Sequence, residues 1–197
     1  VFRILFGLMM FFSTLRFINK GWVKDLYVLP KYYFSYYGFE WVKPFSENGM
    51  NVLFIILLIT SILICIGFIY RLSIITFFLT FTYIELIDKT NYLNHYYFIS
   101  IIAFILIFLP ANKYLSIDVF SGFVKQKEKI NSWCVNIIKF QIGIVYFFSG
   151  IAKLNYDWLI EAQPLTNWLK HQTDLPILGG IMEYSETAFL FSWAGCF

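Results

Sequence analysis

The sequence predicts an all-α protein, a polytopic bundle of about six transmembrane helices. Its 197 residues are 59% hydrophobic and only 14% charged, with a mean hydropathy of +0.68. A soluble domain is about 45–50% apolar and about 25% charged. The apolar residues also gather in runs close to the roughly 20 residues that a helix needs to cross a bilayer. We therefore expect membrane lipid to surround most of the chain.

Composition also argues against several classes of function. The net charge of +3 is too small to indicate a nucleic-acid partner. The three cysteines lie far apart with no C-x-x-C pair, so a dithiol redox site is not expected. The two histidines are too few for a di-metal centre in a membrane, and no metal site is predicted.

The apolar runs predict the spans in order. A tight turn marked by Arg71 must separate the second span from the third, because one helix across both would overshoot the bilayer. In the first span, Arg3 and Arg16 lie toward the ends, where long side chains can reach the interface. A signal peptide is the alternative for this segment, but no small-residue cleavage site follows it. The expected spans are Val1–Ile18, Val52–Tyr70, Leu72–Ile87, Tyr96–Leu109, Trp133–Ile151 and a sixth that begins near Met182.

The long first loop, Asn19–Asn51, is rich in aromatic residues. Aromatic rings with a polar edge favour the membrane–water interface. Two interpretations stay open for this loop. It is an aromatic anchor on the bilayer surface, or it is a lid over a site for a lipid-soluble ligand.

Counting the spans places His95 and Lys153 at the same face of the membrane, because two crossings separate them. The Arg71 turn and the Lys113–Lys129 loop share the other face. Short basic loops mark the cytoplasmic side, so the His95 and Lys153 face is expected to be extracytoplasmic.

Span five carries a polar stripe at helical spacing, formed by Tyr146, Ser149, Gly150 and Lys153. Such a stripe in an apolar helix should face the bundle or a cavity. Taken one at a time, these residues have ordinary explanations. On this explanation the side chain of Lys153 extends from the helix end to the interface. Gly150 then serves only to let a neighbouring helix pack closely.

Several short polar motifs follow one another along the chain with a recognisable spacing. They are Tyr70-Arg71, Asp88-Lys89-Thr90, Asn94-His95, Ala111-Asn112 and Ser116-Ile117-Asp118, followed by Tyr146-Phe147, Gly150, Lys153-Leu154 and Asp157-Trp158. With these motifs the chain resembles the vitamin K-dependent gamma-glutamyl carboxylase family, also called the horizontally transferred transmembrane (HTTM) domain family. The resemblance covers most of the 197 residues. The animal enzymes have two consecutive lysines where this chain has Ala152-Lys153, and only the second is kept.

The resemblance implies an integral-membrane epoxidase that uses vitamin K hydroquinone or a related menaquinol, with O₂ and CO₂ as co-substrates and no metal. Epoxidation would be coupled to γ-carboxylation of glutamate in a protein or peptide substrate. Lys153 would be the base that deprotonates the quinol. This role requires its amine to be neutral, and burial in an apolar site favours the neutral form. His95 would assist at the carboxylation centre.

The remaining site residues come from the polar stripe of span five and from the polar motifs at the span ends. Asn94, Tyr146 and Ser149 are expected to bind the quinol. Five residues are expected to act structurally, with Asp88 and Lys89 pairing with each other or with loop residues: Asp88, Lys89, Arg71, Asp157 and Trp158.

Two alternatives remain beside the carboxylase interpretation. One is a non-enzymatic membrane module of the same fold, used in maturation, export or as a scaffold. The other is a haem quinol oxidase with His95 and His171 as ligands. We expect residues 1–197 to form a single HTTM-like domain truncated at its C-terminus. The bacterial inner membrane is the expected location, or the endoplasmic reticulum in a eukaryote.

Overall fold

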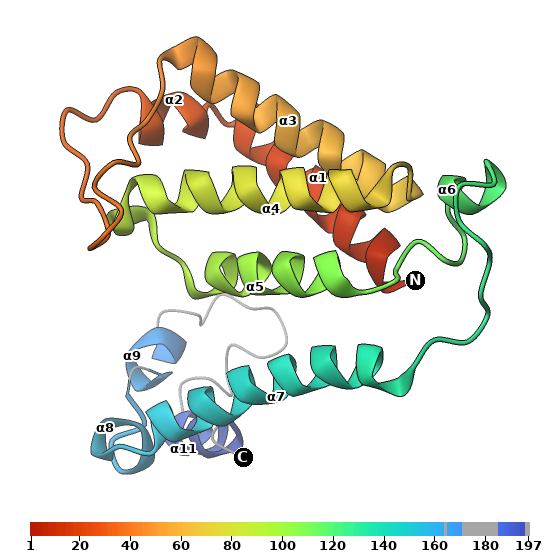
Figure 1. Cartoon of the computed structure of the whole chain (residues 1–197). Helices are drawn as coiled ribbons and strands as arrows, with labels where there is room; N and C mark the ends of the chain where they lie inside the picture. The colour runs from red at the N-terminus through yellow and green to blue at the C-terminus, as the bar shows by residue number, and fades with distance from the viewer. Residues whose placement is uncertain (164, 171–184, 196–197) are drawn as a thin grey trace. The chain divides into compact units, whose positions relative to one another are not determined.

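The computed structural model describes residues 1–163, 165–170 and 185–195. Within these residues every regular element is a helix, which confirms the predicted all-α fold (Figure 1). The chain divides into two compact units, Val1–Cys134 and Val135–Phe197, and each is described by itself. Whether residues 1–197 act as one domain stays a prediction.

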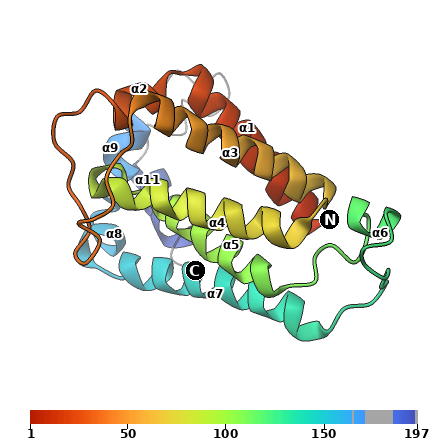
Figure 2. The same ribbon diagram turned by 45° about the horizontal axis from the view of Figure 1, so that its top comes forward.

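Four helices build the first unit: α1 (Phe2–Asn19), α3 (Glu47–Ile66), α4 (Tyr70–Ile87) and α5 (Asn94–Phe108). Consecutive helices run in opposite directions, α1 packs against α3, α3 against α4, and α4 against α5 (Figures 1 and 2). Three short helices lie in the connections: α2 (Trp22–Tyr27), the 3₁₀ helix η1 (Lys89–Asn91) and α6 (Ile117–Phe120). The first loop and the α4–α5 connection share one end of this unit, and the α3–α4 turn and α6 share the other.

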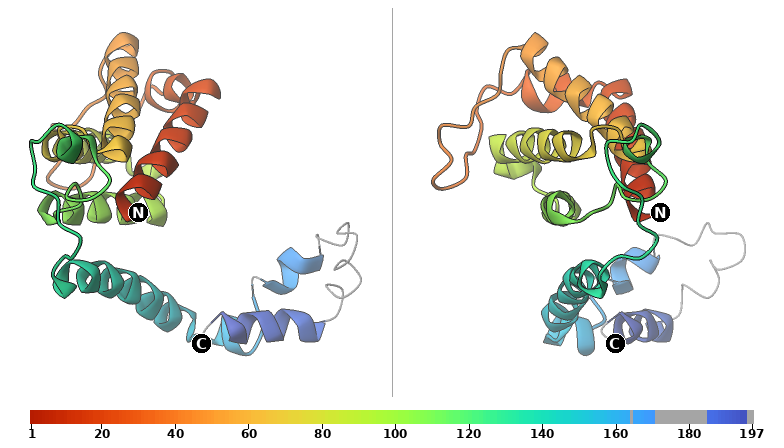
Figure 3. Two further views of the ribbon diagram at one scale, coloured as in Figure 1. Left: turned by 90° about the vertical axis from the view of Figure 1, so that its right-hand side faces the viewer. Right: turned by 45° about the vertical axis from the view of Figure 1, so that its right-hand side comes forward.

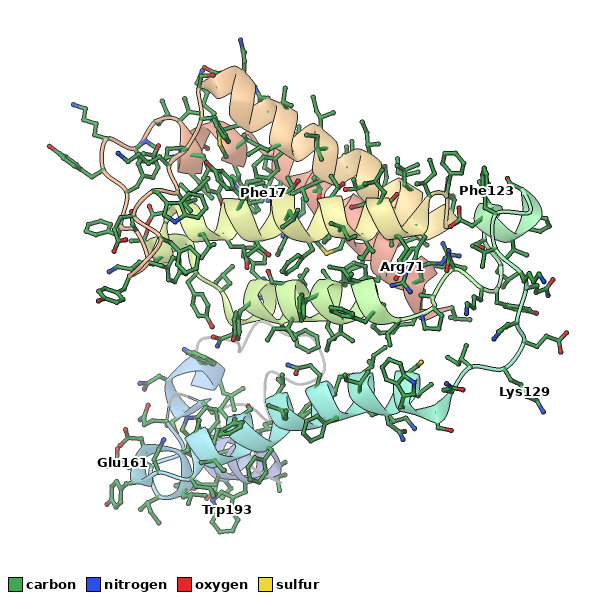
Figure 4. The ribbon with its side chains drawn as sticks, viewed as in Figure 1. Phe17, Arg71, Phe123, Lys129, Glu161 and Trp193 are labelled. Carbon is green, nitrogen blue, oxygen red and sulfur yellow. The ribbon has the colours of Figure 1, made fainter. Side chains whose placement is uncertain are left out.

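The turn between α3 and α4 lies earlier than expected. The second predicted span runs to Tyr70 with Arg71 at the turn, whereas α3 ends at Ile66 and α4 already begins at Tyr70. Gly67 stops α3 in the left-handed conformation with φ of 69°, and the amide of Phe68 donates to the carbonyl of Leu63. Arg71 is exposed in the first turn of α4, near α6 (Figure 4).

The close approach of α1 to α3 depends on the glycine at position 7. A Cβ atom on Gly7 would lie 2.6 Å from the amide nitrogen of Cys65 and 2.7 Å from the carbonyl oxygen of Ser61. Both are backbone atoms of α3, so only glycine allows this approach. Next to this contact Phe6 meets Phe77 edge to face at 5.6 Å between ring centroids.

Aromatic packing also closes the other end of the first unit. Phe17, labelled in Figure 4, stacks on Phe54 with ring centroids 5.0 Å apart. Tyr27 of α2 is buried beside both rings, and burial raises the pKa of its phenol. The first loop is therefore joined to the helix bundle by α2, although Tyr32, Tyr37 and Trp41 of the same loop stay exposed.

Four described helices are long and apolar enough to cross a membrane: α1, α3, α4 and α7 (Ser132–Lys153). The fourth expected span corresponds to α5, which is apolar but has only 15 residues. Helix α11 (Ser185–Ala194) falls in the region of the sixth expected span, whose start at Met182 lies outside the described residues. The expected count of about six is therefore approximate.

The second unit contains most of α7 together with α8 (Tyr156–Leu159), α9 (Leu165–Lys170) and α11. Helix α11 packs against α8 and α9, which Figure 3 shows from two further sides. The hydroxyl of Ser192 donates to the carbonyl of Trp158, and the indole N–H of Trp193 donates to the carbonyl of Leu159 at 3.0 Å. These bonds join the α11 helix to the segment that follows α7.

Candidate functional site

The predicted base Lys153 is the last residue of α7, and its side chain is partly exposed. Its amine donates to the carbonyl oxygen of Gly195 at 2.8 Å and lies 5.1 Å from the centre of the Trp158 ring. A carbonyl oxygen and an aromatic face are both partners that an ammonium group prefers. In this structure the amine is therefore held by contacts suited to its charged form.

Trp158 owes its position to a local cap. The side-chain oxygen of Asn155 accepts a hydrogen bond from the amide of Trp158 at 3.0 Å. This cap allows α8 to begin shortly after α7 ends. This turn places the indole beside Lys153. Asp157 is exposed in the same helix, and its carbonyl accepts the amide of Gln163 at 2.7 Å. The structural role expected for Trp158 thus has a concrete contact, whereas Asp157 contributes a backbone bond.

The predicted quinol-binding residues of α7 are solvent-accessible within their unit. Tyr146 is 74% exposed, and Ser149 is exposed as well. Their spacing places both on the face of α7 that carries Lys153. The quinol-binding role stays a prediction.

Asn94 and His95 open helix α5 in the first unit, and both are exposed. The imidazole of His95 packs against Tyr96 with ring centroids 4.5 Å apart. His95 belongs to the first unit and Lys153 to the second. That they line one cavity stays a prediction.

Asp88 is buried, with 5% of the residue exposed, at the end of α4. One carboxylate oxygen accepts the amide of Thr90 at 2.9 Å and the amide of Phe34 at 3.3 Å. Lys89 is exposed, and its backbone amide donates to the carbonyl of Phe34 at 2.9 Å. Asp88 and the Lys89 backbone thus attach the first loop to the end of α4.

Arg3 corrects an expectation. Its side chain does not extend to the interface, since only 3% of the residue is exposed. The guanidinium donates to four backbone carbonyls at the opposite end of the first unit from His95: Ile64, Cys65, Ala111 and Leu115. The carbonyls of Ile64 and Cys65 belong to the last turn of α3, where a cation is favoured by the helix dipole.

Asp118 completes this polar cluster. Its carboxylate accepts the amides of Ile69 and Tyr70 at 2.7 and 3.1 Å, and the side-chain amide of Asn112 at 2.8 Å. It therefore caps the start of α4 from a segment almost 50 residues further along the chain. The hydroxyl of Ser116 donates to the carbonyl of Asn112. The motifs Ala111-Asn112 and Ser116-Ile117-Asp118 thus meet the start of α4 in one structural cluster.

The site residues predicted from the sequence do not include Glu85. It lies in α4 and accepts a hydrogen bond from the hydroxyl of Ser100 on α5 at 2.8 Å. It also lines a cavity between these two helices. An ionisable side chain inside an apolar span is itself a sequence signal for a site, and this signal could have identified Glu85.

No group of three or more His, Cys, Asp or Glu residues that could hold a metal ion occurs in the part of the chain that the structure describes. His171, the second ligand of the haem alternative, lies outside the described residues.

Comparison with known proteins adds one match. The sequence model of a family described as the HTTM domain matches residues 1–197. No solved structure matches the chain.

Proposed function

Because this chain belongs to the HTTM domain family over residues 1–197, we propose that it is an integral-membrane enzyme that epoxidises a vitamin K-type hydroquinone. The epoxidation is coupled to γ-carboxylation of glutamate in a protein or peptide. The observation that carries the proposal is the family match over the whole chain, together with a lysine and a histidine at the polar ends of two apolar helices.

The hydroquinone supplies the reducing power. One oxygen atom of O₂ enters the epoxide, the other leaves as water, and the proton of the glutamate γ-carbon is replaced by CO₂. The chain's own residues would bind the quinol and move the first proton. The Nζ atom of Lys153 accepts a proton from the quinol hydroxyl, and for this it must exchange its contacts with Gly195 and Trp158 for a drier setting.

His95 and Asn94 carry the polar groups at the start of α5. In the proposal His95 assists carboxylation, and Asn94, Tyr146 and Ser149 hold the quinol. The site faces the extracytoplasmic side of a membrane, the inner membrane if the source is bacterial.

One observation favours a second candidate function, a non-enzymatic membrane module for maturation, export or scaffolding. The Lys153 amine bonds the Gly195 carbonyl and faces the Trp158 ring, as a purely structural cation would. In this candidate Lys153 fastens α11 to the end of α7 and takes up no proton.

An epoxide assay separates the two candidates. The purified full-length protein is given reduced vitamin K or menaquinol in the presence of O₂, and epoxide is measured by chromatography. Lys153→Arg keeps a cation but has no accessible neutral form, so epoxide formation should fall by about 100-fold or more, the size of a general-base contribution. Lys139→Arg, an exposed lysine of the same helix, is the matched control and should retain parental activity.

Added small amines should partly restore Lys153→Ala by acting as a diffusible base. Parental epoxide formation by Lys153→Arg, with quinone binding and folding intact, would establish Lys153 as a charged anchor. No epoxide from the parental protein with either quinol would remove the enzyme candidate and leave the scaffold.

A further inference from the structure

A cavity of about 440 Å³ lies between α4 and α5, within the first unit. This volume is in the range of small-molecule sites, about 300–1,000 Å³. Two facing helical stripes form its walls. They are Phe78, Thr82 and Glu85 on α4, and Tyr97, Ser100 and Phe104 on α5.

The cavity has one polar region. The carboxylate of Glu85 accepts the hydroxyl of Ser100 at 2.8 Å, which leaves most of its acceptor capacity unused. One turn earlier on α4, the hydroxyl oxygen of Thr82 is buried without a hydrogen-bond partner. It is the one such side-chain atom found in the described part of the chain. A buried hydroxyl without a partner is unfavourable. Because Thr82 lines the cavity, a change of its side-chain rotamer would turn the hydroxyl toward a ligand there.

Glu85 also lacks a cationic partner. The ion pair found among the described residues joins Lys24 to Glu47 at 3.3 Å, and no basic side chain of the described chain pairs with Glu85. Charged residues within spans usually pair with an opposite charge or line a ligand path. The missing cation is therefore expected from a ligand.

The two ends of the cavity differ in chemistry. At the loop end the lining consists of Tyr36, Tyr92 and Tyr97. Burial raises the pKa of Tyr36, so its phenol stays neutral and Glu85 supplies the carboxyl group of the lining. Toward the middle of the helices the lining is apolar, where Phe78 and Phe104 pack with ring centroids 5.4 Å apart. A molecule that fits both ends has a polar head and an apolar tail.

We propose that this cavity binds an amphiphile whose head group is a protonated primary amine. The carboxylate of Glu85 and the tyrosine rings attract the ammonium group. The hydroxyl oxygen of Thr82 accepts a hydrogen bond from one N–H of the ammonium group. The alkyl tail lies against Phe78 and Phe104. Glu85 repels an anionic head, and a neutral alcohol leaves the carboxylate without a counter-charge. None of these residues belongs to the proposed quinol site, so the inference stands apart from the enzyme proposal.

Equilibrium dialysis with radiolabelled dodecylamine tests the proposal. The full chain is held in dodecyl maltoside, an uncharged detergent, and binding to protein-free micelles is subtracted. We expect one saturable site per chain and at least about tenfold weaker binding of dodecanol, a difference of 1.4 kcal/mol. Glu85→Gln should weaken dodecylamine binding by about tenfold or more. Glu47→Gln, an exposed carboxylate in the first turn of α3, is the matched control and should bind as the parent does.

Thr82→Val keeps the shape of the side chain and removes the hydroxyl, so it should weaken amine binding several-fold. Phe104→Trp should reduce binding of any amphiphile by filling the apolar end. These two variants carry the test if Glu85→Gln does not fold, as judged by size-exclusion chromatography. The proposal is overturned if Glu85→Gln binds dodecylamine as the parent does, if dodecanol binds as tightly as dodecylamine, or if Thr82→Val and Phe104→Trp both leave amine binding unchanged.

Discussion

Asp118→Asn should loosen the first unit at the end that carries the α3–α4 turn. The Asp118 carboxylate accepts three hydrogen bonds, two from the backbone amides of Ile69 and Tyr70 and one from Asn112. Only 4% of the residue is exposed, so water cannot readily replace these bonds. An asparagine offers one acceptor oxygen and turns an NH₂ group toward donors, so at least one donor loses its partner.

The size of the effect follows from these contacts. A hydrogen bond to a charged group contributes about 1.5–3 kcal/mol, and a buried donor left unpaired adds a further penalty. Asp118→Asn should therefore lower the free energy of unfolding by about 2–4 kcal/mol. Asp118→Ala removes all three acceptor contacts and should exceed about 3 kcal/mol. Both changes act by uncapping the first turn of α4.

Unfolding in mixed dodecyl maltoside and SDS micelles, followed by far-UV circular dichroism, measures this change. Glu128→Gln is the control, because Glu128 is an exposed carboxylate in a loop and should change stability by less than about 0.5 kcal/mol. If Asp118→Asn unfolds at the same SDS fraction as Glu128→Gln, the long-range cap does not stabilise the protein and the reasoning fails.

Three further predictions concern other parts of the chain. Gly7→Ala should destabilise the protein by about 1–3 kcal/mol, because the added Cβ would press on the backbone of α3. Gly143→Ala is the control in the same SDS titration and should be neutral or stabilising, because there is open space around Gly143. Asp88→Asn should lower stability by about 1–3 kcal/mol by releasing the first loop, yet leave epoxide formation per folded molecule unchanged, and loss of turnover with intact stability would contradict this. Lys153→Arg should lower epoxide formation by about 100-fold or more while Lys139→Arg retains it, as chromatography of the products will show.

The sequence alone predicted the helical class and most of the helices. A bilayer offers no hydrogen-bond partners to the backbone, so an apolar run of sufficient length has to form a helix. Helices α1, α3, α4 and α7 accordingly lie close to the expected spans. The chemistry of the candidate site came from motifs around His95 and Lys153, and the match to the HTTM family over residues 1–197 confirms the resemblance on which it rested.

Local signals also placed a turn between α3 and α4, but not its exact position. The sequence places this turn at Arg71, the only charged residue between Val52 and Ile84. Gly67 ends α3 instead, because it adopts a left-handed conformation that other residues rarely take. Helix α4 then begins at Tyr70, whose amide donates to the carboxylate of Asp118.

Only the tertiary structure decided which groups Arg3, Asp118 and Glu85 contact. The sequence places Arg3 at the interface, yet its guanidinium donates to backbone carbonyls that lie 61 to 112 residues further along the chain. Hydropathy and helical spacing report which face of a helix is apolar, but they contain no information on which distant backbone groups lack partners. Those groups become neighbours only when the helices pack, and each buried donor or acceptor must then be satisfied by whatever side chain lies beside it.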